Sequence, residues 1–116
     1  MRSTLHLMLS SAIVVVCIGC SMTLPVRGRV QDSAETFSGT ATGHLDGGGS
    51  LQMVSSKGSV CKGNFVYVNG RQGEGVFNCD DGRSGPFTFV STGTAGTGYG
   101  TLNNERFIFT FGNQGG

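Results

Sequence analysis

The sequence predicts an all-β protein, a small antiparallel meander that forms a twisted sheet or partly closed barrel of about six to seven strands. From residue 35 onward, apolar and polar residues alternate in short segments. Each segment is followed by a turn signal rich in Gly, Asn or Asp, at the spacing of about 8 to 12 residues that is typical of all-β folds. No window has a helical period long enough to predict a helix.

Seven segments are expected to be strands, and the turns between them consist of residues that accept positive φ. The expected strands are residues 35–43, 50–55, 60–68, 73–80, 86–91, 96–102 and 106–111. The expected turns are Asp46-Gly47-Gly48-Gly49, Lys57-Gly58, Asn69-Gly70, Asp81-Gly82 and Asn103-Asn104.

Glycine makes up 21 of the 116 residues and is concentrated in particular strands. Phe107, Phe109 and Phe111 share one face of their segment, whereas "GEG" at 73–75 and "GTGYG" at 96–100 place glycines on a single face. Glycine weakens an isolated strand, so its use at every second position predicts bulky neighbours that need the space. We therefore expect Phe to lie across from Gly between neighbouring strands.

Cys61 and Cys79 are expected to face each other across a loop centred on Gly70, which also sets Phe65 opposite Gly75. A two-residue Asn69-Gly70 turn has the better turn chemistry, but it would not set Cys61 directly opposite Cys79. The register that pairs the cysteines therefore requires a bulge near residue 71. In an exported protein the two cysteines are expected to form a disulfide. The alternative is a zinc site with His44, but two Cys and one His without CxxC spacing are a weak ligand set.

The first twenty residues resemble a lipoprotein signal. Met1 and Arg2 precede a mostly apolar run at residues 5–18, which is shorter than the roughly 20 residues needed to span a bilayer and has the order of a signal-peptide h-region. Cys17-Ile18-Gly19-Cys20 then resembles the lipobox of bacterial lipoproteins, with Cys17 where Leu or Val is usual. An ordinary secretory signal is the alternative; a redox CxxC lacks the surrounding βαβ pattern.

The lipobox resemblance implies a signal peptide at residues 1–19, whose removal would also remove Cys17. Cys20 would become the mature N-terminus, with a thioether-linked diacylglycerol and often an N-acyl chain such as palmitate. We then expect residues 20–34 to be a lipidated N-terminus and tether, and residues 35–116 to be the β domain. Ser21 in place of Asp favours the outer membrane, facing the periplasm, over inner-membrane retention; surface exposure is a further alternative.

Composition and motifs predict neither nucleic-acid binding nor catalysis. The 8 basic and 7 acidic residues form no basic stripe. His44 is the only histidine left after cleavage, so a Ser-His-Asp arrangement would depend on it alone, and Asp80 and Asp81 are expected in a turn. "DDGRSG" lacks the alternate ligands of a calcium loop. We expect no enzyme activity, no metal and no cofactor besides the covalent lipid.

Two further resemblances bear on function. Residues 73–112 resemble small uncharacterised proteobacterial lipoproteins with G-x-G, C-x-D-G-R-x-G-P-F and G-x-G-x-G motifs, which imply no known activity. "FNCDDG" resembles a segment of periplasmic lysozyme inhibitors, although their inhibitory loop has no match here. We expect a non-enzymatic, membrane-anchored lipoprotein with a structural or binding role and an envelope protein or glycan partner. The alternative is a periplasmic inhibitor or binder of a cell-wall hydrolase such as lysozyme.

Overall fold

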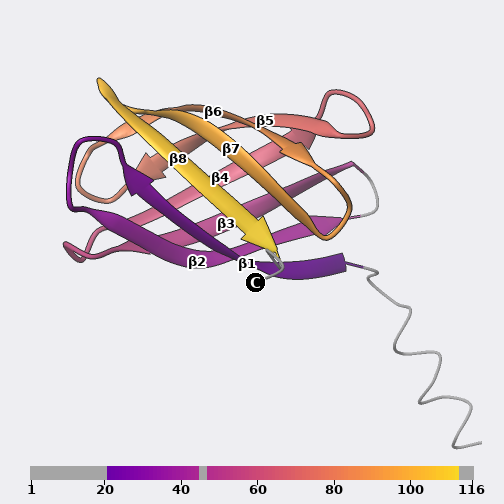
Figure 1. Ribbon diagram of the computed structural model, residues 1–116, viewed down its shortest axis with the longest axis horizontal. Coiled ribbons are helices and arrows are strands. Elements are labelled where there is room, and N and C mark those ends of the chain that lie inside the picture. Colours follow the sequence, from indigo (N-terminus) through magenta and orange to yellow (C-terminus); the bar gives the residue numbers. More distant parts are fainter. Residues whose placement is uncertain (1–20, 45–46, 113–116) are drawn as a thin grey trace, which may run out of the picture.

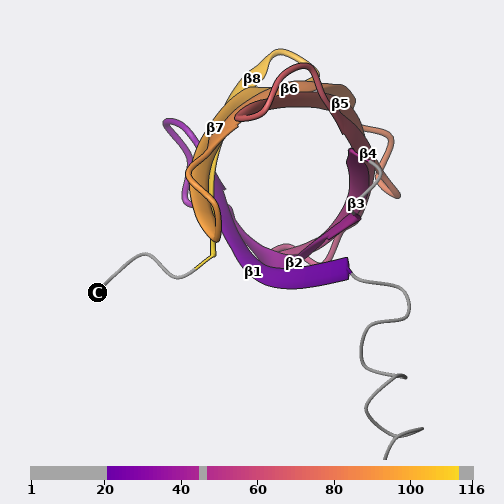
Figure 2. The same ribbon diagram turned by 90° about the vertical axis from the view of Figure 1, so that its right-hand side faces the viewer.

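The computed structural model describes residues 21–44 and 47–112, which form one closed antiparallel barrel (Figures 1 and 2). Each strand pairs with the next along the chain, and the last pairs with the first. The described residues contain no helix able to span a membrane. The strands are β1 (Ser21–Val30), β2 (Thr36–His44), β3 (Gly48–Ser55), β4 (Val60–Tyr67), β5 (Gln72–Cys79), β6 (Ser84–Ser91), β7 (Ala95–Leu102) and β8 (Glu105–Gly112).

The predicted all-β meander is confirmed, and β2 to β8 match the seven expected strands to within a few residues. The expected tether at residues 20–34 is wrong for most of its length, because Ser21–Val30 forms β1. This strand pairs with β2 on one side and with β8 on the other, so it converts an open meander into a closed barrel. Ser21, the residue that follows Cys20 in the sequence, is therefore already part of the barrel.

β1 has a period-two pattern that its proline obscures. Met22, Leu24 and Val26 alternate with polar residues, and the inward positions of the strand become more buried toward Val30. Proline lacks the N–H needed in a central strand and is tolerated at edges. Within the described residues, β8 pairs with β1 only from Val26 onward, so Pro25 has a paired strand on one side alone.

The barrel interior contains all eight phenylalanines of the chain, and each of them is buried. They lie on alternate positions that share one parity within each strand, as expected for side chains on the inner face. Edge-to-face contacts join rings from different strands, including Phe37 with Phe107 at 5.1 Å between centroids. The eight are Phe37, Phe65, Phe77, Phe87, Phe89, Phe107, Phe109 and Phe111.

The predicted pairing of Phe with Gly is confirmed, most clearly along β7. Gly96, Gly98 and Gly100 face inward between the phenylalanine-bearing strands β6 and β8. Gly98 pairs with Phe109 on one side and with Phe89 on the other. A Cβ at Gly98 would overlap the Phe109 ring and lie 2.5 Å from the Thr88 carbonyl oxygen. The glycines thus make room for rings that cross the barrel.

The predicted register of β4 and β5 is also confirmed. Cys61 pairs with Cys79 and Phe65 pairs with Gly75. The cysteines form a disulfide between residues separated by 18 positions, which contributes about 3 kcal/mol in the chain-entropy model. The connecting loop occupies residues 68–71, where Asn69 Oδ1 accepts hydrogen bonds from the backbone N–H groups of Arg71 and Gln72.

Replacing an inward glycine of β7 should destabilise the barrel. We expect Gly98→Ala to lower the free energy of unfolding by about 1 to 3 kcal/mol, because the added methyl group overpacks against Phe109 and the β6 backbone. The matched control is Gly43→Ala in β2, where a Cβ would meet no heavy atom within 4 Å. Urea denaturation measures both. Equal stability of the two variants would contradict this account of the glycines.

Candidate functional site

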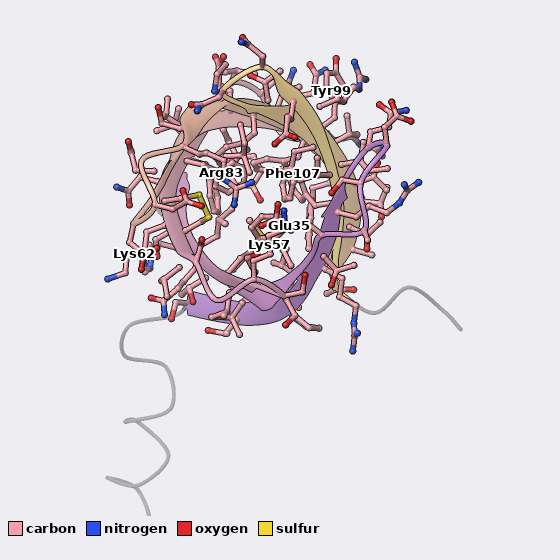
Figure 3. All side chains as sticks on the ribbon, turned by 90° about the vertical axis from the view of Figure 1, so that its left-hand side faces the viewer. Glu35, Lys57, Lys62, Arg83, Tyr99 and Phe107 are labelled. Atoms are coloured by element: carbon pink, nitrogen blue, oxygen red, sulfur yellow. A yellow bond between two sulfur atoms is a disulfide. The ribbon has the colours of Figure 1, made fainter. Side chains whose placement is uncertain are left out.

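The two ends of the barrel differ in how they are filled. One end carries the loops at 31–35, 56–59, 80–83 and 103–104; we call it the closed end. The other carries the loops at 68–71 and 92–94, together with the start of β1 and the end of β8; we call it the open end. Figure 2 looks into the open end and Figure 3 into the closed end, where Glu35 and Arg83 lie across the opening.

A buried ion pair fills the closed end. The Arg83 Nη1 and Nη2 atoms donate to the two carboxylate oxygens of Glu35, each at 2.8 Å, and the Ser55 hydroxyl donates to the same carboxylate. Arg83 also bonds Asp81, with 3.0 Å between Nε and Oδ2, and lies over the Phe37 ring. The Glu35 side chain is only 2% exposed. Bidentate, charge-assisted bonds of this kind have a fixed geometry, so the group acts as a rigid plug.

The plug holds its members in their charged forms. The hydrogen bonds from Arg83 hold the pKa of Glu35 below its ordinary value, and they outweigh the effect of burial, which raises it. The same guanidinium, together with the Ser59 hydroxyl, lowers the pKa of Asp81. The two carboxylates in turn raise the pKa of Arg83.

The open end contains an apolar cavity of about 430 Å³. Its volume lies within the range of roughly 300 to 1,000 Å³ that is common for small-molecule sites. The space exists because the inward residues here are small or lie at the rim: a Cβ on Gly43, for example, would meet nothing within 4 Å. The wall includes Leu24, Val26, Ala41, Leu51, Phe65, Phe89, Phe109 and Phe111.

Polar groups in the cavity lining are confined to the region around its mouth. Ser21 and His44 are register partners at the ends of β1 and β2, and Tyr67 ends β4. Among residues 21–44 and 47–112, no Asp, Glu, Lys or Arg lines the cavity. The cavity is therefore suited to the uncharged body of an apolar molecule, with hydrogen-bonding groups available where a polar end would emerge.

The structure separates the site residues expected from the sequence. Cys20 lies outside the described residues. Cys61 and Cys79 are bonded to each other near the closed end, and no group of three or more metal-ligating side chains occurs within 21–44 and 47–112. His44 lies at the open end, far along the barrel from the plug carboxylates. Asp80 and Asp81 bond the backbone and side chains around their turn, as expected of turn residues.

Sequence reasoning missed both the plug and the cavity. The signal for the plug was the alternation of inward and outward positions along each strand. Glu35 is two residues before the inward Phe37. Arg83 is two residues before Gly85 and four before Phe87, which also face inward, so both charges were on inward positions. A pair of opposite charges on inward positions predicts a buried ion pair. The cavity has no comparable local signal, because its lining comes from strands across the whole barrel.

A second hollow, of about 600 Å³, follows the outer face over β1 and β6 to β8. Arg27, Arg29 and Arg106 line it, and the Arg106 guanidinium lies 4.7 Å from the Tyr99 ring centroid. Tyr99 is labelled on this outer surface in Figure 3. This hollow is larger, but it is lined by three arginines and is the more open of the two, so we regard the more apolar cavity at the open end as the better candidate site.

Comparison with known proteins shows the fold alone. No family model and no curated protein matches the chain. Among solved structures, a redesigned β-barrel, mFAP1, bound to DFHBI, is similar, with a TM-score of 0.63 and 14% identity over 78% of this chain and 92% of that one. A de novo designed fluorescence-activating β-barrel has a TM-score of 0.60 and 16% identity over 79% of this chain and 91% of its own.

The plug makes stability depend on pH. Folding lowers the pKa of Glu35, so the ionised carboxylate contributes to the free energy of unfolding. This contribution is complete above the unfolded pKa, near 4.5, and is lost as pH falls through the folded pKa. We expect Glu35→Gln to lower the free energy of unfolding by about 2 kcal/mol at pH 7, since it removes the bidentate carboxylate partner of a guanidinium that is only 16% exposed. The difference in the free energy of unfolding between Glu35→Gln and the wild type should be smaller at pH 3 than at pH 7. Urea denaturation at both pH values measures it.

Glu105→Gln is the matched control, because the Glu105 carboxylate lies 3.7 Å from Arg83 and is 54% exposed. We expect it to change stability by less than about 1 kcal/mol at pH 7. A cost for Glu35→Gln that stays constant from pH 7 to pH 3 would refute the charged plug.

Proposed function

We propose that the protein is a non-enzymatic lipoprotein of the bacterial envelope that binds a small apolar molecule in the open-end cavity. Cys20 carries the lipid, and the outer membrane, facing the periplasm, is the favoured location. The observation that supports the binding role is the apolar cavity of about 430 Å³ at the open end of the barrel. The plug and the disulfide are consistent with this role, since both hold strands together near the closed end, away from the cavity.

The fold is compatible with binding of this kind. An eight-stranded barrel has an interior just wide enough to be filled by side chains or to hold one small ligand. The redesigned barrel of similar fold is described as bound to DFHBI. In the present chain the same interior is filled by phenylalanine rings over part of its length, and the ligand would occupy the remainder.

The alternative, an inhibitor of a cell-wall hydrolase, has less support. The inhibitory loop of such inhibitors has no match in this sequence, and residues 91–99, the stretch nearest to it, depart from its pattern. They comprise the end of β6, a tight turn at 92–94 and the first half of β7. The turn is closed by a hydrogen bond from the Thr92 N–H to the Ala95 carbonyl. A turn of this length projects little from the barrel and is a poor shape for entering an enzyme cleft.

Lipid attachment is tested by metabolic labelling with palmitate in a Gram-negative host. We expect label on the wild-type chain and on Cys17→Ala, and none on Cys20→Ala, because only Cys20 occupies the modified position of the lipobox. Globomycin should cause the precursor to accumulate. Label retained on Cys20→Ala, or processing unaffected by globomycin, would contradict the lipoprotein assignment.

Ligand binding is tested with the soluble chain from Ser21 and the neutral probe N-phenyl-1-naphthylamine, whose fluorescence rises in apolar sites. We expect saturable binding that Ala41→Trp weakens at least tenfold, because the indole would fill the cavity beside Gly43. Thr42→Trp, one residue along β2 and outside the cavity lining, is the matched control.

Circular dichroism establishes that both variants fold, and Leu24→Asn provides a second, milder change to the cavity wall. Probe binding that is absent from the wild-type chain would contradict a binding role for the cavity. The same conclusion would follow if Ala41→Trp and Thr42→Trp bound the probe equally well.

A further inference from the structure

We propose that the ligand of the open-end cavity is the acyl chain of a lipid, and that the anchor at Cys20 holds the cavity mouth against the bilayer that supplies it. This inference rests on the proposed function and names its ligand class. It follows from the place of the cavity relative to the chain's N-terminus, together with the shape and the rim of the cavity.

The mouth of the cavity lies next to the expected lipid attachment site in the sequence. Ser21 lines the cavity, and Cys20 is the next residue toward the N-terminus. Consecutive Cα atoms are about 3.8 Å apart, so a lipid on Cys20 is attached within one residue of the mouth. Because β1 begins at Ser21, the strand structure leaves no room for the spacer that a 20–34 tether would have supplied. The open end is thus the end nearest the membrane.

The shape of the cavity suits a chain. Along β1 the lining runs from Met22 at the rim to Val26, a path of about 13 Å at the strand rise of about 3.3 Å per residue. The aromatic side chains of Phe65, Phe89 and Phe109 contribute to the wall. An apolar space lined over this length of strand accepts a flexible hydrocarbon chain, while a polar head would remain near Ser21 and His44.

The surface around the mouth suits contact with a bilayer. Met22, Val66 and Val68 are each about half exposed, at 49%, 57% and 54%. Tyr67 lies among them, and tyrosine is enriched at membrane interfaces. The charged cluster of Glu35, Arg83, Asp81 and Glu105 lies at the opposite end of the barrel. In the described open-end loops the charged side chain is Arg71, a cation that can face lipid headgroups. This distribution favours an orientation with the open end toward the lipid and the plug toward water.

Two sources could supply the chain: the lipid on Cys20 itself or a lipid of the bilayer. A group attached through a short linker has an effective concentration on the order of mM, and bilayer lipid is also abundant at the mouth. The chemistry that the cavity recognises is the same in both cases. The experiments below therefore test acyl-chain binding first and the source second.

Acyl-chain binding is tested on the soluble chain from Ser21, which contains all eight strands of the barrel. The probe is dansyl-undecanoic acid. We expect saturable fluorescence enhancement, reversal by laurate, and at least tenfold weaker binding to Ala41→Trp but not to Thr42→Trp. If N-phenyl-1-naphthylamine binds but the fatty acid does not, the acyl-chain inference is overturned and the proposed function stands. If neither binds, both fail.

Orientation is tested with tryptophan reporters in the full-length lipidated protein, since the natural chain contains no Trp. The protein is reconstituted in phosphatidylcholine vesicles that contain lipid brominated in mid-chain, a short-range quencher. We expect strong quenching of Met22→Trp at the open end and little quenching of Asn104→Trp, which lies in the turn between β7 and β8 at the closed end. Equal quenching of the two reporters, or quenching of neither, would overturn the orientation.

A third reporter, Phe65→Trp in the cavity wall, identifies the source of the chain. Quenching of this reporter by the brominated lipid indicates that a bilayer lipid enters the cavity. If Phe65→Trp is not quenched in vesicles, bilayer lipid does not enter the cavity. The lipid on Cys20 is then the occupant if the lipidated protein in detergent, unlike the soluble chain, fails to bind dansyl-undecanoic acid; if it binds the fatty acid as the soluble chain does, the cavity of the anchored protein is empty and the proposal is overturned.

Discussion

The structure depends on one packing constraint: bulky phenylalanine rings and glycines must alternate around the inside of a narrow closed barrel. An eight-stranded barrel has little interior volume, and eight phenylalanines occupy most of it. Rings from β6 and β8 reach across the backbone of β7, where Gly96 and Gly98 leave the space. The high glycine content is therefore a consequence of the core, because close packing tolerates neither overlap nor voids.

The same constraint explains why the two ends differ. Toward the closed end the inward positions carry large side chains and then the Glu35–Arg83 pair, so the interior is filled up to the loops. Toward the open end the inward positions of β1 and β2 become small or lie at the rim, as at Ala41 and Gly43, and a cavity results. A barrel that is rigid at one end and hollow at the other can hold a ligand without rearranging, which lowers the entropic cost of binding.

Much of the fold could be predicted, because it is encoded in local patterns. Strand positions follow from alternation, and the opposition of Cys61 and Cys79 follows from counting residues around Gly70, as the observed register confirms. β1 was missed because residues 20–34 were expected to be a tether, although Met22, Leu24 and Val26 follow the strand period. Its role is visible only when β8 is placed beside it.

By itself, the sequence determined the all-β class, the parity of the strands and the disulfide, because each depends on residues that are adjacent or evenly spaced. The lipobox at Cys20 stays a prediction. Only the tertiary structure decided that the sheet closes, that Glu35 meets Arg83 across the closed end, and that an apolar cavity opens beside Ser21. These features bring together residues from distant strands. Their positions depend on strand stagger and barrel closure, which no local periodicity specifies.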